Sequence, residues 1–433
     1  MSPIWYLTWR SVANRRLSVA LTVIAVALSV AMLIGVERLR NDAREGFART
    51  LSGTDLVVGA RSGSVQLLLY SVFHMGNATN NMSWASLQQI AALPQVDWTV
   101  PISLGDSHRG FRVIGTTPDF FTRYRYGVDQ PLVLAAGRSF AAAPDGLFEV
   151  VLGAEVAARF GYREGARIVL SHGSGGGVSF SDHADKPFTV VGVLARSGTP
   201  VDRSLLVGLE GIEAIHVDWQ GGAPIPGLSI APEHVRKFDL TPKTVTAALV
   251  GLKSRVAVFR VQRQINTFAA EPLSAILPGA TLQELWGLVG IAEQALLAVS
   301  ALVVVVGLAG LVAVMVAGLG ERRRELAILR ALGAGPRQIL ALLALESMAL
   351  ALAGIVCGLM LVYGASAALA PWLAAEFGLH LGMGSQPGWP PALPSVSEWV
   401  LLGAVFAASV LASLVPGFRA YRYSVADGMT IRI

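Results

Sequence analysis

Residues 171–188 contain four side chains of the kinds that bind metal ions. They are His172, Asp182, His183 and Asp185, in the stretch SHGSGGGVSFSDHADKPF. Imidazole nitrogens and carboxylate oxygens are ligands for zinc and related ions, and the glycines would let the loop fold over an ion. Their spacing is irregular, so a surface loop with unrelated histidines is the simpler interpretation. The sequence leaves both open and gives no confident metal site.

Motifs for hydrolytic chemistry and for ATP binding are missing from the sequence. It contains no H-E-x-x-H, no G-x-S-x-G with a convincing triad, and no G-x-x-x-x-G-K-[ST] loop. We therefore expect the chain not to be an enzyme and to bind no cofactor of its own.

A second stretch of interest is ERRRELAILRALGAGPRQIL, residues 321–340, which is rich in arginine yet lies between two long apolar runs. Its apolar residues recur among the charges and predict a short amphipathic helix, which Gly333 and the Gly335-Pro336 pair would end. An arginine loop that only fixes topology needs no apolar face. An amphipathic helix is suited to docking in a groove on a soluble partner.

The composition indicates a membrane protein with a large water-exposed part. Of 433 residues, 53% are hydrophobic and 15% charged, and the mean hydropathy is +0.56. A bilayer core needs about 20 apolar residues per helix. Four predicted spans meet this requirement: 17–36, 286–318, 339–369 and 399–415. The first is too long for a signal peptide and lacks a small-residue cleavage site, so we expect an uncleaved anchor.

Arginine placement predicts the orientation of these spans. Outside residues 37–285, arginines occur only before the first span, between the second and third, and after the fourth, and residues 370–398 contain none. By the positive-inside rule both termini face the cytoplasm. The predicted fold class is an integral membrane protein with four transmembrane helices, N-in and C-in, and a large extracytoplasmic α+β domain between the first two.

The extracytoplasmic segment 37–285 reads as two lobes. A mixed α/β lobe is predicted from residues 37–104 and 231–285, with a strand-rich lobe, 105–230, inserted into it. The single cysteine, Cys357, lies in the third span, so this domain has no disulfide and depends on its apolar core. The remaining predicted parts are an interfacial helix at 1–16, a cytoplasmic loop at 319–338, a periplasmic loop at 370–398 and a cytoplasmic tail at 416–433.

The stretch ERRRELAILRALGAGPRQIL, together with TWRSVANRRLSVALTVIAVALSVAM near the N-terminus, closely resembles the MacB/FtsX-type ABC transporter permeases. This mechanotransmission group includes LolC and LolE, and the resemblance extends over the whole chain. In the family the first stretch is the coupling helix that sits on the ATPase subunit. The resemblance assigns that role to Glu321, Arg324, Glu325, Leu326, Ile328, Leu329, Arg330, Leu332, Gly333 and Ala334.

The resemblance also implies partners and a function. Since no ATPase motif is present, ATP and magnesium are expected in a separate ABC ATPase subunit, with a second permease chain, identical or related, completing the transporter. Membrane lipids and a periplasmic adaptor or cargo-carrying protein are further expected partners, and nucleic acid is not. The chain would sit in the bacterial inner membrane and couple ATP hydrolysis to movement of a periplasmic or outer-leaflet cargo. The alternatives are FtsX-like signalling to a cell-wall hydrolase and metal-related envelope transport.

Overall fold

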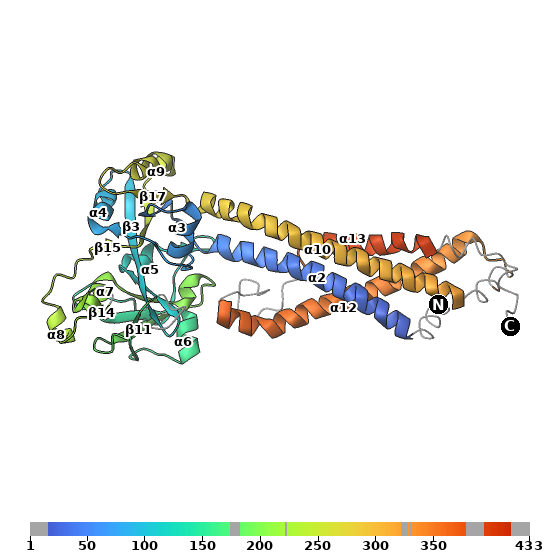
Figure 1. Cartoon of the computed structure of the whole chain (residues 1–433), viewed down its shortest axis with the longest axis horizontal. Helices are drawn as coiled ribbons and strands as arrows, with labels where there is room; N and C mark the ends of the chain where they lie inside the picture. The colour runs from blue at the N-terminus through green and yellow to red at the C-terminus, as the bar shows by residue number, and fades with distance from the viewer. Residues whose placement is uncertain are drawn as a thin grey trace. The chain divides into compact units, whose positions relative to one another are not determined.

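The computed structural model describes residues 16–173, 182–220, 223–321, 328, 331, 333–377 and 394–416 (Figure 1). The chain divides into two compact units. One comprises Met1–Ala43 and Gly290–Ile433, and the other is Arg44–Val289. The second unit corresponds closely to the segment predicted to form the extracytoplasmic domain, and the two are considered separately below.

The first unit is built from long apolar helices. Among the described residues, four helices are long and apolar enough to cross a membrane, as the sequence predicts. They are α2 (Arg16–Arg49), α10 (Pro278–Glu321), α12 (Pro336–Phe377) and α13 (Val396–Ala412). Two of these helices extend beyond the predicted spans, since α2 continues to Arg49 and α10 begins at Pro278.

Small residues allow these helices to pack closely. Gly354 and Gly358 of α12 are four residues apart and both face α2. A Cβ atom at Gly358 would lie 2.8 Å from the Cβ atom of Val30, and one at Gly354 would lie 2.5 Å from a methyl carbon of Val26. The hydroxyl of Ser29 reaches across from α2 to the carbonyl of Val303 in α10, at 3.2 Å. This small-xxx-small arrangement is typical of membrane helices, for which close van der Waals packing replaces the hydrophobic effect.

The second unit is organised around an eleven-stranded sheet. Nine strands follow one another in the order β17-β1-β16-β3-β4-β12-β8-β11-β7, with β10 pairing β3 and β9 pairing β11. Their bounds are β1 (Leu56–Ala60), β3 (Val96–His108), β4 (Phe111–Thr116), β7 (Leu134–Gly137), β8 (Glu149–Leu152), β9 (Arg167–Ile168), β10 (Ser171–His172), β11 (Phe188–Leu194), β12 (Ser204–Gly208), β16 (Ala247–Leu252) and β17 (Leu273–Ile276).

The thirteen-residue strand β3 joins two parts of this sheet. The first part contains β17, β1 and β16, and the second contains β4, β12, β8, β11 and β7. The first half of β3 pairs with β16, and its second half pairs with β4 and β10. The predicted boundary between the lobes, at residues 104 and 105, falls inside β3. Strands from both predicted lobes therefore belong to one hydrogen-bonded sheet.

Helices cover both faces of the first part of the sheet, as alternating side chains require. Val57 packs with Leu67 and Leu68 of α3 (Ser64–Ser71) on one face. Its neighbour Val58 packs on the opposite face, with Leu87 of α4 (Trp84–Ala91) and Val261 of α9 (Val258–Asn266). The predicted helix with a serine cap is confirmed, because the Ser83 side chain accepts from the Ser86 amide at the start of α4.

The second part carries α6 (Ala154–Phe160) and α7 (Leu209–His216), both at predicted positions. The remaining elements are short: β2 (Met82–Ser83), α5 (Asp119–Arg123), β5 (Arg125–Tyr126), β6 (Gln130–Pro131), η1 (Pro200–Arg203), β13 (Trp219–Gln220), β14 (Ala223–Pro224), α8 (Pro232–Val235), β15 (Thr244–Val245) and η2 (Arg255–Ala257).

Candidate functional site

The segment predicted to dock on an ATPase lies between α10 and α12, and the structure describes part of it. Glu321 is the last residue of α10, Ile328 is helical with 53% of its surface exposed, and Gly333 has φ of 93°. A left-handed glycine is the usual residue after a helix end. Ala334 is half-buried. The other predicted members lie outside the described residues: Arg324, Glu325, Leu326, Leu329, Arg330 and Leu332.

Five polar side chains form a largely buried cluster inside the helix bundle, which we call the bundle charge cluster: Glu37, Arg38, Arg40, Tyr363 and Glu398. The Arg38 guanidinium lies 3.6 Å from the Glu398 carboxylate. It also donates to the Tyr363 hydroxyl at 3.3 Å and stacks 4.5 Å from the Tyr363 ring centroid. Arg40 pairs with Glu37 at 2.8 Å. These contacts connect α2 to both α12 and α13.

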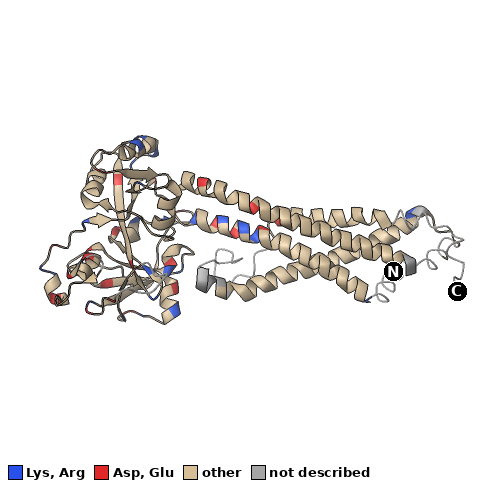
Figure 2. Cartoon of the chain, in the orientation of Figure 1, with Lys and Arg blue, Asp and Glu red and all other residues tan. Residues whose placement is uncertain are grey.

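The bundle charge cluster was not predicted from the sequence, and α10 and α12 also contain the acidic residues Glu293 and Glu346. Glu346 is buried and Glu293 is partly buried. Buried charges are costly unless they are paired, so a paired cluster restricts how the helices can separate. Figure 2 shows that the acidic and basic residues of α2 gather toward its C-terminal end and that few occur along the rest of the helices.

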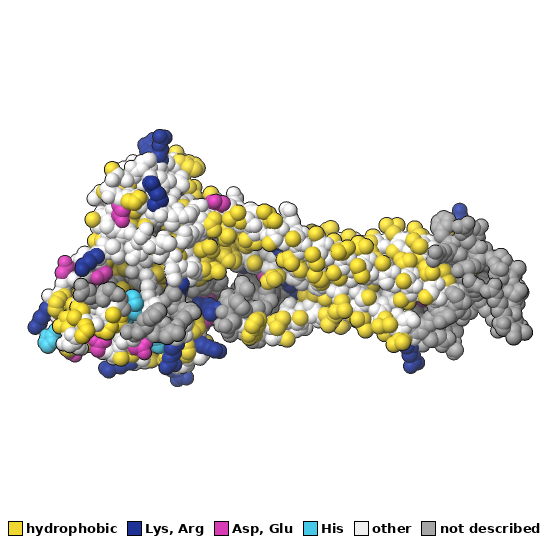
Figure 3. All heavy atoms as spheres, viewed as in Figure 1, with side chains coloured by type: hydrophobic (Ala, Val, Ile, Leu, Met, Phe, Trp, Pro, Cys, Tyr) yellow, Lys and Arg dark blue, Asp and Glu magenta, His cyan; other side chains and the backbone are white. Residues whose placement is uncertain are grey.

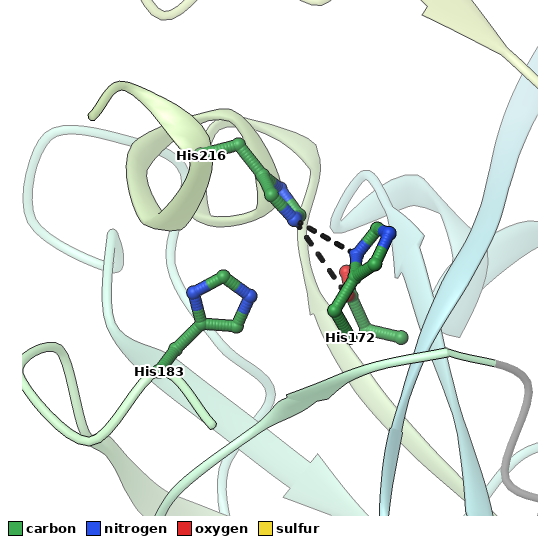
Figure 4. Close-up of side chains that lie close together, drawn as sticks. His172, His183 and His216 are labelled. Carbon is green, nitrogen blue, oxygen red and sulfur yellow. Dashed lines mark hydrogen bonds and ion pairs between the residues drawn. The ribbon is translucent and has the colours of Figure 1, made fainter. Parts of the chain in front are cut away.

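A second buried cluster lies in the periplasmic-type unit, and we call it the histidine cluster: Asp106, His172, His183 and His216. One ligand atom from each residue lies within 4.8 Å of the others. His216 Nε2 is 3.3 Å from His172 Nδ1 and 3.7 Å from Asp106 Oδ1. His172 Nδ1 is 3.3 Å from the same Asp106 oxygen. Figure 4 shows the three imidazole rings turned toward one another.

Separate segments of the fold bring these four residues together. Asp106 and His172 are direct partners in the antiparallel pairing of β3 with β10. His183 is held by its backbone N–H, which donates to the Leu170 carbonyl at 2.9 Å. His216 is the last residue of α7. Neighbouring Trp219 covers the rings, with its centroid 4.1 Å from that of His183.

Burial and hydrogen bonding set the protonation of the imidazoles. The ring of His183 is fully buried, and among the described residues neither of its nitrogens has a hydrogen-bond partner. Burial, with the neighbouring His216 and His172 adding to it, lowers the pKa of His183 to about 4. The Asp106 carboxylate raises the pKa of His172, against the opposing effect of burial. His183 is therefore neutral at pH 7 and has an unshared lone pair.

A buried ion pair lies next to the histidine cluster in sequence. Lys186 is fully buried, and its ammonium contacts Asp218 at 2.8 Å and Asp185 at 2.6 Å. Burial opposes ionisation of Asp218, but hydrogen bonds from Lys186 and the Ile230 amide lower its pKa overall. The two carboxylates more than neutralise the charge of the buried lysine, so the lysine adds no excess positive charge beside the imidazoles.

Of the four metal candidates chosen from the sequence, the structure brings two together. His172 and His183 belong to the histidine cluster, whereas exposed Asp182 accepts a hydrogen bond from the Ser171 hydroxyl and Asp185 pairs with Lys186. The two members that sequence reasoning missed are Asp106 and His216. Only the strand register and the end of α7 bring them near His172, and neither can be read from local spacing.

The turn-rich stretch 196–219 contains a buried acidic side chain. Its Asp202 is buried and accepts hydrogen bonds from the Ser197 and Gly198 amides and the Ser197 hydroxyl. Burial raises the pKa of Asp202 despite these bonds. The acid thus organises the turn internally. Two other predicted features, the interfacial helix before residue 16 and the apex of loop 370–398, lie outside the described residues.

Comparisons with known proteins match both units of the chain. The MacB-like periplasmic core domain matches residues 19–268, and the FtsX-like permease C-terminal domain matches residues 297–425. The periplasmic region of MacB from Actinobacillus actinomycetemcomitans aligns with 55% of this chain and 94% of its own, at 11% identity and a TM-score of 0.32. The extracellular domain of the noncanonic ABC-type transporter YknZ from Gram-positive bacteria aligns with 52% of this chain and 99% of its own, at 12% identity and a TM-score of 0.28. Among curated proteins, no sequence matches the chain.

Proposed function

Because this chain belongs to the MacB/FtsX-type permeases of ABC transporters, we propose that it converts ATP hydrolysis by a separate ATPase subunit into movement of its periplasmic domain. As a member it is an inner-membrane protein with a periplasmic domain, and its own role is that of a permease. The arginine distribution supports an orientation with both termini in the cytoplasm. That orientation would place residues 321–340 where an ATPase could bind them.

The observation that carries this proposal is the continuity of α2 and α10. The periplasmic unit begins at Arg44 and ends at Val289, while α2 runs from Arg16 to Arg49 and α10 from Pro278 to Glu321. Each helix thus supplies residues to both units without a helix break. A displacement of the cytoplasmic end of α10 would be carried along one hydrogen-bonded rod, because helices are stiff over this length.

The buried residues of the bundle fit helices that act as stiff rods better than helices that line a polar conduit for cargo. Among the residues that the structure describes, the buried charged side chains of the four helices are Glu37, Arg38, Glu346 and Glu398. Arg38 and Glu398 pair with each other, and Glu37 pairs with Arg40. A polar conduit needs a row of polar groups facing a shared lumen. The outer surface of the bundle in Figure 3 is largely hydrophobic, as contact with lipid requires.

Within this mechanism two permease chains, identical or related, would each present a coupling helix to an ATPase dimer. ATP and magnesium would bind in the ATPase subunits. The cargo would be a lipoprotein, lipid, peptide or small toxic molecule taken from the periplasm or the outer leaflet, handed on where needed by an adaptor or carrier protein. FtsX-like signalling is the less favoured alternative, because the large periplasmic unit exceeds what a signalling member usually carries.

The test is to co-purify the chain with its cognate ABC ATPase and measure ATP hydrolysis. Leu329→Asp should abolish stimulation of the ATPase, because it puts a charge on the apolar face expected to enter the ATPase groove. Leu329→Met, which nearly conserves volume, is the matched control and should retain at least half of the stimulation. Normal association and stimulation in Leu329→Asp would refute the docking of this segment.

A further inference from the structure

We propose that Asp106, His172, His183 and His216 form a zinc-binding site in the periplasmic domain. This site is separate from the coupling of ATP hydrolysis, and neither proposal depends on the other. Three observations support it: the spacing of the four ligand atoms, a fully buried imidazole without a hydrogen-bond partner among the described residues, and a buried carboxylate beside the imidazoles.

The spacing agrees with tetrahedral coordination. Zinc binds histidine nitrogen and carboxylate oxygen at about 2.0–2.1 Å, so two ligands of a tetrahedral ion lie about 3.3–3.4 Å apart. The measured separations are 3.3 Å for His216–His172, 3.3 Å for His172–Asp106 and 3.7 Å for His216–Asp106. Three ligand atoms therefore already outline one face of such a tetrahedron. His183 lies within 4.8 Å of all three, so a small rotation of its side chain would complete the set.

The hydrogen bonding of His216 leaves one of its nitrogens available to an ion. His216 Nδ1 lies 2.8 Å from the Ile212 carbonyl, which can only accept, so this nitrogen carries the proton. Its Nε2 is then an unprotonated nitrogen that points at His172 and Asp106. A backbone carbonyl on the far nitrogen is the usual way in which a metal-binding histidine is oriented.

His183 is the residue that hydrogen bonding within the protein does not explain. Its side chain is fully buried, and both ring nitrogens lack a partner in the part of the chain that the structure describes. A polar group in this position is costly to bury, which is why buried polar groups nearly always have a partner. The Asp106 carboxylate is also buried, with 4% of its surface exposed. A bound cation would satisfy an imidazole nitrogen of His183 and the charge of Asp106 together.

The ligand set favours zinc over other common ions. Three imidazoles and one carboxylate suit a borderline transition metal, whereas calcium and magnesium prefer oxygen ligands. Four protein ligands fill a tetrahedral ion and leave no position for water, which is the arrangement of a structural site. Since His172 and His216 keep 34% and 25% of their side chains exposed, an ion has a route of entry from solvent. Bound zinc would tie β3, β10, α7 and the segment at His183 to one another.

The experiment uses the full chain in detergent micelles, stripped with EDTA and dialysed. Zinc is titrated in competition with a chromophoric chelator, and cobalt is titrated separately to observe the visible absorption of tetrahedral cobalt. We expect one zinc per chain and a rise in the thermal unfolding midpoint when zinc is added, because an ion that binds only the folded state stabilises it. His183→Ala and His172→Gln should each weaken zinc binding by at least about 100-fold, more than the loss of an outer-shell partner typically causes.

Two control variants separate this site from other zinc-binding groups. His234→Ala removes an exposed histidine outside the cluster, and Asp182→Asn removes an acid next to His183 that lies outside it. Both should keep wild-type affinity. His172 is partly exposed, so His172→Gln should keep the wild-type unfolding midpoint in EDTA and show that lost binding is not misfolding. Absence of zinc binding to the wild-type chain, or unchanged affinity in both His183→Ala and His172→Gln, would overturn the proposal, and ATPase coupling would be unaffected by either result.

Discussion

The helix bundle and the periplasmic domain each bury a polar cluster, and the two differ in what surrounds the buried groups. In the bundle charge cluster each carboxylate faces an arginine on its own or a neighbouring helix. In the histidine cluster one carboxylate faces two imidazoles, while His183 has no hydrogen-bond partner within the described ranges. The first arrangement holds helices together with groups that the chain itself provides. The second is complete only with a cation.

The largest expected effect concerns the buried ion pair of Lys186 with Asp218, which lies in the periplasmic domain. Like the bundle charge cluster, this pair consists of a cation and a carboxylate that the chain itself provides. Lys186→Met keeps the length of the side chain and leaves Asp218 buried without its cation. Removing one partner of a buried pair typically destabilises a protein by about 3–5 kcal/mol. We expect a loss of that size in the free energy of unfolding, followed by tryptophan fluorescence during denaturant titration.

Asp185 provides the matched control for this variant. It contacts the same ammonium but is 39% exposed, so Asp185→Asn should cost less than about 1 kcal/mol. The double variant Lys186→Met with Asp218→Asn should recover part of the stability, which a double-mutant cycle would detect. Equal losses for Lys186→Met and Asp185→Asn would show that burial does not determine the strength of this pair.

In the bundle, Glu398→Gln tests whether the charge pair itself holds the helices. Arg38 would lose its carboxylate but keep the hydroxyl and ring of Tyr363, so we expect a loss of about 2–3 kcal/mol, less than for an unsupported buried charge. The glutamine oxygen can still accept from the Ser395 amide, which is half of the capping box of α13. The measurement is the thermal unfolding midpoint of the full chain in detergent.

Ser395→Ala is the comparison for that variant. It removes the side-chain cap of α13 and leaves the Arg38–Glu398 contact in place, and a lost cap costs about 1 kcal/mol. Glu398→Gln should therefore lower the midpoint further than Ser395→Ala. The reverse order would mean that Glu398 acts mainly as a helix cap and that its pairing with Arg38 contributes little.

The sequence predicts features that depend on composition and short periodicity. The four spans, the outward continuation of α2 and the helices α4, α6 and α7 all follow from runs of apolar residues, caps and local patterns. The 13-residue strand β3 was missed because Pro101 and Gly105 interrupt its apolar alternation, although it joins the two parts of the sheet.

The candidate sites show the same limit. His172 and His183 are eleven residues apart in sequence and were identified from their residue types, whereas Asp106 and His216 join them only through strand pairing and the position of α7. Arg38 and Glu398 are likewise far apart in the chain and meet through helix packing. Residue types show which groups are able to do chemistry. The long-range contacts that select among them arise from tertiary structure, which one sequence does not reveal.

An effect smaller than that of Glu398→Gln concerns the response of the periplasmic domain to acid, and it depends on His74. Burial, with Arg112 adding to it, lowers the pKa of His74 from 6.5 to about 4. Between these values the unfolded chain binds a proton that the folded domain does not, so the stability from neutral His74 is present above pH 6.5 and is lost as the pH falls toward 4. We expect about 1–2 kcal/mol less stability at pH 4.5 than at pH 7 from this residue, since it is partly exposed and one pKa unit corresponds to about 1.4 kcal/mol.

His74→Asn should flatten this part of the pH profile, with EDTA present throughout so that loss of zinc does not contribute. A profile identical to wild type in that variant would place the acid response in other groups, such as His108, whose pKa burial also lowers.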